Sequence, residues 1–153
     1  MSRRDVMQLV LLLLIPAGCA GVGWLLGRLI RGRRPQIERE RPRIATSAAY
    51  LRDAHDATLS AHTRVRCAFE AVYFCCCEIA ESRGMHIDGL EHPNPEVVEA
   101  GLCALDVSTD DRFAAERLTK WTVGASPFLP ELSVDDACRL AERICARTTS
   151  MLT

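Results

Sequence analysis

The sequence predicts an all-α protein in which one N-terminal transmembrane helix precedes a bundle of four to five helices. Three observations predict this fold class: an apolar run near the N-terminus, apolar residues that recur every three or four positions in the remainder, and helix-capping residues between those stretches. No stretch shows the alternating pattern of a β-strand. We therefore expect a transmembrane anchor over residues 1–31, a basic Pro/Arg linker over 32–44 and an α-helical domain over 45–153.

The predicted anchor is a single apolar run. Residues 6–26 read VMQLVLLLLIPAGCAGVGWLL, and Gln8 is their only strongly polar side chain. A run of this length crosses about 30 Å of hydrocarbon, whereas a cleaved signal peptide has a shorter one. We interpret it as an uncleaved anchor. Two alternatives stay open, namely a lipoprotein signal that ends at Cys19 and another kind of processed signal.

The arginines that flank the apolar run predict its orientation. Arg3 and Arg4 precede the run, and seven arginines follow it: Arg28, Arg31, Arg33, Arg34, Arg39, Arg41 and Arg43. Positive residues close to a span stay on the cytoplasmic side, so we expect the helical domain in the cytoplasm. Arginine outnumbers lysine eighteen to one, a bias that indicates a bacterial coding preference and hence the bacterial inner membrane.

The apolar run also predicts two kinds of partner. Its helix would contact membrane lipids, and Gly23 and Gly27 form a GxxxG pattern in which small residues let two helices approach closely. A homodimer is therefore one expectation, although glycine is common in membrane helices for other reasons.

Charge is unevenly distributed between the two parts of the chain. Residues 1–44 carry a net charge of +6 and residues 45–153 a net charge of −7. An acidic domain repels a phosphate backbone, so we expect no binding of nucleic acid by it. The stretch RGRRPQIERERPRI, residues 31–44, holds two prolines and many charges, which is typical of a solvated linker.

Capping residues predict the bounds of the helices in the domain. The expected helices run from Thr46 or Ser47 to about Asp56, from Ser60 to Gly84, from Asn94 to about Leu105, from Ser108 or Thr109 to the loop GASPFLPELS, and from Ser133 onward. Asp136, three residues after Ser133, completes a capping box.

Three of these helices have a recognisable apolar face. The second helix presents Val65, Ala68, Phe69, Val72, Tyr73, Cys76, Ile79 and Ala80. The fourth presents Phe113, Leu118 and Trp121, and the last presents Ala137, Leu140, Ala141, Ile144 and Cys145.

Two segments resemble a known family. The stretch RVRCAFEAVYFCCCEIAESRG, residues 64–84, resembles the central helix of HEPN-type helical domains, and LPELSVDDACRLAERI, residues 129–144, is similar to their closing part. The resemblance covers about residues 46–150 and implies a compact bundle that often dimerises, in a family of ribonucleases and non-catalytic partners. Its catalytic members carry an arginine followed four to six residues later by a histidine. Arg52 and Arg83 each stand only three residues before a histidine, so none of the four histidines here shows that spacing. The resemblance thus implies a non-catalytic member.

Other polar clusters match catalytic or metal sites only in part. His55 and Asp56 form the HD dipeptide of metal phosphohydrolases, but His62 alone does not complete the ligand set that those enzymes need. In the turn GMHIDGLEHPNP, two histidines and two acids offer nitrogen and oxygen ligands for a metal, namely His86, Asp88, Glu91 and His92. We interpret the turn as a solvated loop. We assign no catalytic, cofactor-binding or metal-ligating residue and no cofactor.

The three consecutive cysteines, Cys75 to Cys77, lie in the second predicted helix. Successive residues of a helix point about 100° apart, so the three thiols cannot face one metal ion. Cys76 belongs to the apolar face, and we interpret the cysteines as small core residues. A thiol sensor that uses Cys75 or Cys77, and a metal site, are the alternatives. Burial of Cys75 and Cys77 beneath a neighbouring helix would favour packing.

Together these features predict a membrane-anchored α-helical module for interaction or regulation, with an unknown protein partner and without an evident catalytic site. Two alternatives from other classes stay open. One is a HEPN-type ribonuclease with an unrecognised active site, and the other is a cysteine-based redox or metal sensor.

Overall fold

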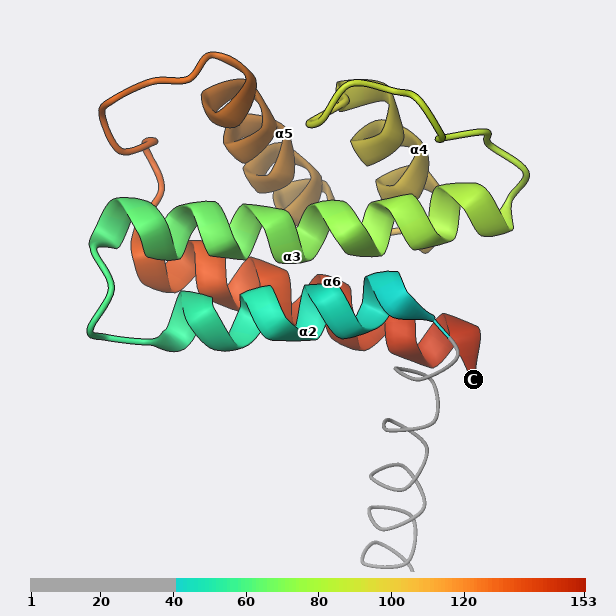
Figure 1. Cartoon of the computed structure of the whole chain (residues 1–153), viewed down its shortest axis with the longest axis horizontal. Coiled ribbons are helices and arrows are strands. Elements are labelled where there is room, and N and C mark those ends of the chain that lie inside the picture. Colours follow the sequence, from blue (N-terminus) through green and yellow to red (C-terminus); the bar gives the residue numbers. More distant parts are fainter. Residues whose placement is uncertain (1–40) are drawn as a thin grey trace, which may run out of the picture. The chain divides into compact units, whose positions relative to one another are not determined.

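The computed structural model describes residues 41–153, which form five α-helices and no strand (Figure 1). They are α2 (Pro42–His55), α3 (Ala61–Ser82), α4 (Pro95–Leu105), α5 (Thr109–Val123) and α6 (Val134–Leu152). The prediction of an all-α bundle is confirmed for this part of the chain. The predicted anchor and most of the predicted linker lie outside the described residues. Within residues 41–153, no helix combines the length and the apolar character that a membrane span requires.

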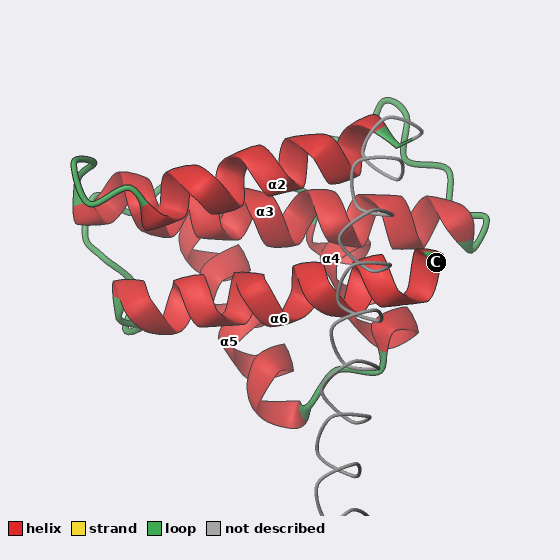
Figure 2. Ribbon diagram, turned by 90° about the horizontal axis from the view of Figure 1, so that it is seen from below, coloured by secondary structure: helices red, strands yellow, loops and turns green. Residues whose placement is uncertain are grey.

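Helix α3 is the centre of the bundle and packs against all four other described helices. Figure 1 shows α4 and α5 on one side of α3, with α2 and α6 on the other. Seen from below, α2 and α6 lie side by side, with α4 and α5 behind them (Figure 2). Because it is covered on both sides, α3 buries residues all round its circumference instead of along one stripe.

The bounds of α3 agree with the capping prediction. The Ser60 side chain accepts a hydrogen bond from the backbone N–H of Thr63 at 3.1 Å. At the other end, Gly84 has a φ of +91°, a conformation that side chains with a Cβ rarely adopt. All eight residues predicted for the apolar face of this helix are buried.

Helix α2 begins four residues earlier than the predicted cap at Thr46. Pro42 occupies its first turn, where the missing N–H costs no hydrogen bond. Ser47, the other predicted cap, is 2% exposed in the interior, and its hydroxyl donates to the carbonyl oxygen of Ala71 at 2.9 Å. The prediction of the helix start was wrong because Ser47 has a partner on α3 and not on its own helix.

Two ion pairs hold the start of α2 against the end of α3. Arg41 Nη1 lies 2.6 Å from Glu78 Oε1, and Arg43 pairs with Glu81. Glu78 is 8% exposed, so Arg41 supplies the counter-charge that a buried carboxylate requires. These two arginines, which the sequence placed in a solvated linker, therefore contact the helical domain.

The last three helices begin where the sequence predicts. Asn94 accepts from the N–H of Glu96, Ser108 from that of Asp111, and Ser133 from that of Asp136. The Ser133 hydroxyl also donates to Asp136 Oδ2 at 2.6 Å, whereas in a capping box this carboxylate would accept from the backbone N–H of Ser133.

Two predicted core positions are not buried. Leu118 and Trp121 of α5 face the core, but Phe113 is 60% exposed. On α6, the four residues from Ala137 to Ile144 predicted for the apolar face are buried, whereas Cys145 is only partly buried. At about 100° per residue, Phe113 is rotated by about 140° from Leu118 and Cys145 by about 100° from Ile144, so neither points to the centre of the buried face.

Candidate functional site

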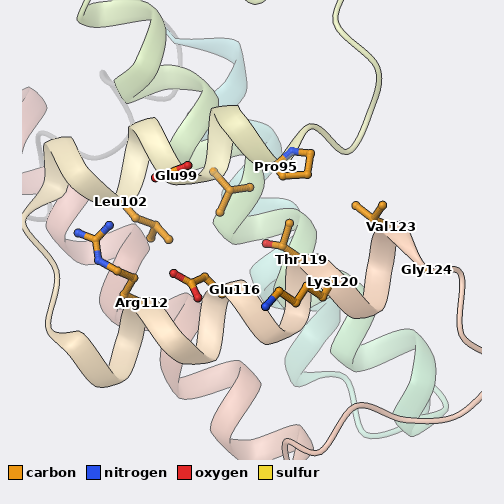
Figure 3. A pocket seen from close by; sticks show the side chains of 10 residues that line it. Pro95, Glu99, Leu102, Arg112, Glu116, Thr119, Lys120, Val123 and Gly124 are labelled. Carbon is orange, nitrogen blue, oxygen red and sulfur yellow. The ribbon is translucent and has the colours of Figure 1, made fainter.

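A groove lies between α4 and α5 (Figure 3). Its volume is about 440 Å³. Ten residues line it, namely Pro95, Val98, Glu99, Leu102, Arg112, Glu116, Thr119, Lys120, Val123 and Gly124. The groove is apolar at its base, where Val98 and Leu102 are 2% and 1% exposed.

The rim of the groove is charged with both signs. Glu99 of α4 and Glu116 of α5 supply two carboxylates, and Arg112 and Lys120 of α5 supply two cations (Figure 3). Arg112, Glu116 and Lys120 are spaced four residues apart, so they follow one face of α5. Lys120 is the only lysine of the chain.

Exposed apolar side chains continue from the groove into the loop after α5. Val123 lines the groove and is 52% exposed. In the following loop, Phe128 and Leu129 are 78% and 49% exposed. Trp121 Nε1 donates a 2.6 Å hydrogen bond to the carbonyl oxygen of Phe128, which fixes the loop backbone while the phenyl ring faces solvent. A large aromatic side chain that is exposed to solvent is typical of a surface that binds another protein.

The HD dipeptide does not assemble a metal site. His55 Nε2 contacts Glu142 Oε1 at 3.0 Å, and Asp56 accepts two hydrogen bonds from Thr58 in the turn after α2. The ring of His62 instead lies 5.0 Å from that of Trp121. His55 therefore links the end of α2 to α6, and Asp56 stabilises the turn that follows α2.

The turn before α4 sends its titratable side chains to different partners. Asp88 lies 4.0 Å from Arg43. His92 Nε2 lies 2.9 Å from Glu70 Oε2, in a contact that lacks hydrogen-bond alignment. Within residues 41–153, no group of three or more His, Cys, Asp or Glu side chains is placed to hold a metal ion.

An arginine and a histidine do meet at Glu70, which the sequence spacing did not indicate. Arg66 Nε donates to Glu70 Oε1 at 2.9 Å, on the opposite oxygen from His92. The His92 ring also packs edge-on against Tyr73 at 4.4 Å. Burial raises the pKa of Tyr73 to about 12, so its phenol stays protonated and accepts a hydrogen bond from the N–H of Asn94. The cluster anchors the turn before α4. A phosphodiester ligand would have to compete with the buried Glu70 carboxylate for both Arg66 and His92.

All three consecutive cysteines are buried. Cys75, Cys76 and Cys77 are 1%, 0% and 6% exposed. Burial raises the pKa of the Cys76 thiol and that of the Cys77 thiol, so both remain protonated at neutral pH. Packing is thus the role of Cys76, as predicted, and of Cys77. Cys75 differs because its sulfur contacts a cysteine of α6.

Comparison of the chain with protein-family models, with curated proteins and with solved structures gives no match.

The groove was not predicted from the sequence. Its base uses Val98 and Leu102 from the apolar face of α4, which in a sequence look like ordinary core positions. Two signals pointed to it: Val123 extends the apolar character of α5 to its last turn, and the only lysine of the chain stands beside it.

Proposed function

We propose that this chain is a single-pass protein of the bacterial inner membrane whose helical domain acts in the cytoplasm as an interaction module. The apolar run at residues 6–26 and the arginines that follow it support the anchor and its orientation. The groove between α4 and α5 is the observation that supports the interaction role. We retain the HEPN-like, non-catalytic relationship as part of this proposal.

The groove has the composition of a site for a protein partner. Its base is apolar, its rim is charged, and an exposed aromatic ring stands in the adjoining loop. Apolar contacts supply most of the association free energy, while rim charges select the partner and its register. The net charge of −7 on residues 45–153 argues against nucleic acid as the ligand.

A second copy of the same chain is the partner that the rim favours. A two-fold contact brings the same surface together from both molecules, so a surface with charges of both signs can be self-complementary. If two α5 helices pack antiparallel, Glu116 of each copy can lie opposite Lys120 of the other. Each dimer would then have two such pairs around its apolar centre.

Charge reversal in the full chain tests this assignment. Lys120→Glu places two carboxylates opposite each other in both pairs, and Glu116→Lys places two cations there, so each single variant should dissociate more readily. The double variant restores opposite charges and should regain the wild-type dimer. Sedimentation equilibrium in detergent micelles at low salt measures the dissociation constant, and we expect a change of about tenfold or more for each single variant.

The matched control is Arg139→Glu, which reverses an exposed charge on α6 whose partner, Asp136, lies on its own helix. It should leave the dissociation constant unchanged. A monomeric wild-type chain would refute self-association. If the double variant stays as weak as the single variants, the groove serves a different partner, because only a self-complementary surface is restored by exchanging its own charges.

Membrane attachment needs a separate test. The full chain expressed in bacteria should stay in the membrane fraction after extraction at alkaline pH, and a chain that lacks residues 1–31 should not. A Cys19→Ala variant should behave as the wild type if the anchor is an uncleaved helix, and should change its processing if Cys19 is lipidated. Protease added to intact spheroplasts should spare the helical domain; its digestion there would overturn the proposed orientation.

A further inference from the structure

Two cysteines from different helices meet beneath α2. Cys75 Sγ of α3 lies 3.6 Å from Cys145 Sγ of α6, and the two are not joined by a disulfide. Ser47 Oγ of α2 lies 3.1 Å from the first sulfur and 3.2 Å from the second. The two thiols and the hydroxyl therefore form one contact among three helices.

The hydrogen bonds of this contact require protonated thiols. The Ala71 carbonyl oxygen can only accept, so the single hydroxyl proton of Ser47 is used in that 2.9 Å bond. Toward both sulfurs the Ser47 oxygen can then only accept. Cys75 Sγ also lies in position to donate to Cys145 Sγ, so its single proton serves one of these two acceptors. The hydrogen bond with Cys145, followed by burial, raises the pKa of Cys75 well above its ordinary value. The pair is a dithiol in its resting state.

The two thiols differ in access to solvent. Cys75 is 1% exposed, whereas Cys145 is partly exposed at the surface of α6. A reagent in solution can thus reach Cys145 first, and Cys75 is in place behind it. A disulfide bond is about 2.05 Å long, so the sulfurs need to approach each other by about 1.5 Å from their separation of 3.6 Å.

We propose that Cys75 and Cys145 form an oxidisable dithiol whose reaction partner is a low-molecular-weight disulfide. Deprotonated Cys145 attacks one sulfur of the small disulfide, breaks its S–S bond and releases one thiolate, which takes up a proton. Cys75 then attacks Cys145 Sγ, the mixed disulfide breaks, and a second small thiol leaves with the proton of Cys75. Two protein thiols are oxidised to one disulfide while the small disulfide is reduced to two thiols.

The product would join α3 to α6 through a covalent bond and would remove both thiol protons from the contact with Ser47. The site differs from the sensor considered from the sequence, because Cys77 takes no part and the second thiol comes from α6. It is also independent of the groove, since none of the three residues lines that surface.

The test uses the full chain in detergent micelles, with Cys103→Ala to remove the exposed thiol of α4. The protein is incubated with oxidised glutathione, alkylated under denaturing conditions and digested with trypsin. We expect two fewer alkylated thiols, and a peptide linked through Cys145 whose fragmentation places the other sulfur at Cys75 and not at Cys76 or Cys77. Dithiothreitol should restore both thiols.

Two variants complete the test. Cys145→Ser should abolish the linked peptide, whereas Cys138→Ser, on the same helix, should retain it because that sulfur bonds to the Ala54 carbonyl oxygen instead. Full alkylation of the oxidised protein, a link from Cys145 to a cysteine other than Cys75, or a link that persists in Cys145→Ser would each overturn the proposal. Peptide mapping of the parent protein gives the answer even if a variant fails to fold.

Discussion

Gly101 of α4 crosses α3 directly over Cys76. A Cβ atom added to Gly101 would lie 2.5 Å from both the Cα and the Cβ atoms of Cys76. Real Cβ atoms do not approach backbone so closely, so the two helices can cross here only because one position is glycine. Cys76, the middle cysteine of the run, lies directly against Gly101 at this crossing. This explains why α3 needs a small apolar side chain at that position.

Gly101→Ala should destabilise the bundle. At an exposed helical site this change stabilises by about 1 kcal/mol, because alanine has the higher helix propensity. Here the added methyl group would force α4 away from α3, at a cost of about 1–3 kcal/mol. Thermal and urea unfolding of the full chain measure the difference. Cys103→Ala, on the exposed side of α4, is the control and should be nearly neutral; a higher unfolding midpoint for Gly101→Ala would contradict the close crossing.

Substitutions of Cys76 should depend on size. Cys76→Ala removes one buried atom and should lower the free energy of unfolding by about 1 kcal/mol. Cys76→Leu adds volume where α4 lies against the α3 backbone and should cost about 1–3 kcal/mol. Urea unfolding measures the free energy of unfolding of both variants and of the wild type. If Cys76→Leu proves as stable as the wild type, the site has room for a larger side chain. That result would contradict the close crossing of α3 and α4 at Gly101.

The ion pair between Asp111 and Arg143 should make stability depend on pH. Arg143 Nη2 lies 2.5 Å from Asp111 Oδ1, and its hydrogen bonds lower the pKa of this carboxyl below its ordinary value of 3.8. The unfolded chain therefore takes up the proton at a higher pH than the folded chain does. The ion pair's contribution to the free energy of unfolding is fully present at a pH above the ordinary pKa of an aspartate. It is lost as the pH falls through the lower pKa of Asp111 in the folded state.

Asp111→Asn should accordingly cost about 1 kcal/mol at pH 7 and progressively less below pH 4, a modest value because Arg143 is half exposed. Asp110→Asn is the matched control, since it removes a neighbouring charge from the same first turn of α5 without touching Arg143. Urea unfolding between pH 3 and pH 7 follows both variants. An equal loss for both at every pH would assign the effect to the helix terminus and not to the ion pair.

Features that depend on neighbouring residues in the chain could be predicted from the sequence. The caps at Asn94, Ser108 and Ser133 act on N–H groups two or three residues away, and all three helices begin there. The apolar face of α3 was predictable for the same reason, because a period of three to four residues is a local property of one helix.

Features that depend on distant partners could not be predicted. Ser47 looked like a helix cap, but its partner Ala71 belongs to another helix. The sequence left open whether Cys75 and Cys77 lie beneath a neighbouring helix, and both are buried because helices cover α3 on two sides. The groove and the contact between Cys75 and Cys145 arise only when separate helices are placed together.

Zero-length crosslinking through Lys120 tests the proposed self-association most directly. A carbodiimide joins an amine to a carboxylate only when the two are already in contact, and Lys120 is the only lysine of the chain. In the full chain reconstituted into lipid vesicles, we predict a product of twice the 16.9 kDa chain mass, with Lys120 of one copy joined to Glu116 of the other. The product should disappear in Lys120→Arg, which keeps the charge and removes the amine. The absence of this dimer, or its persistence in Lys120→Arg, would contradict an interface at the groove.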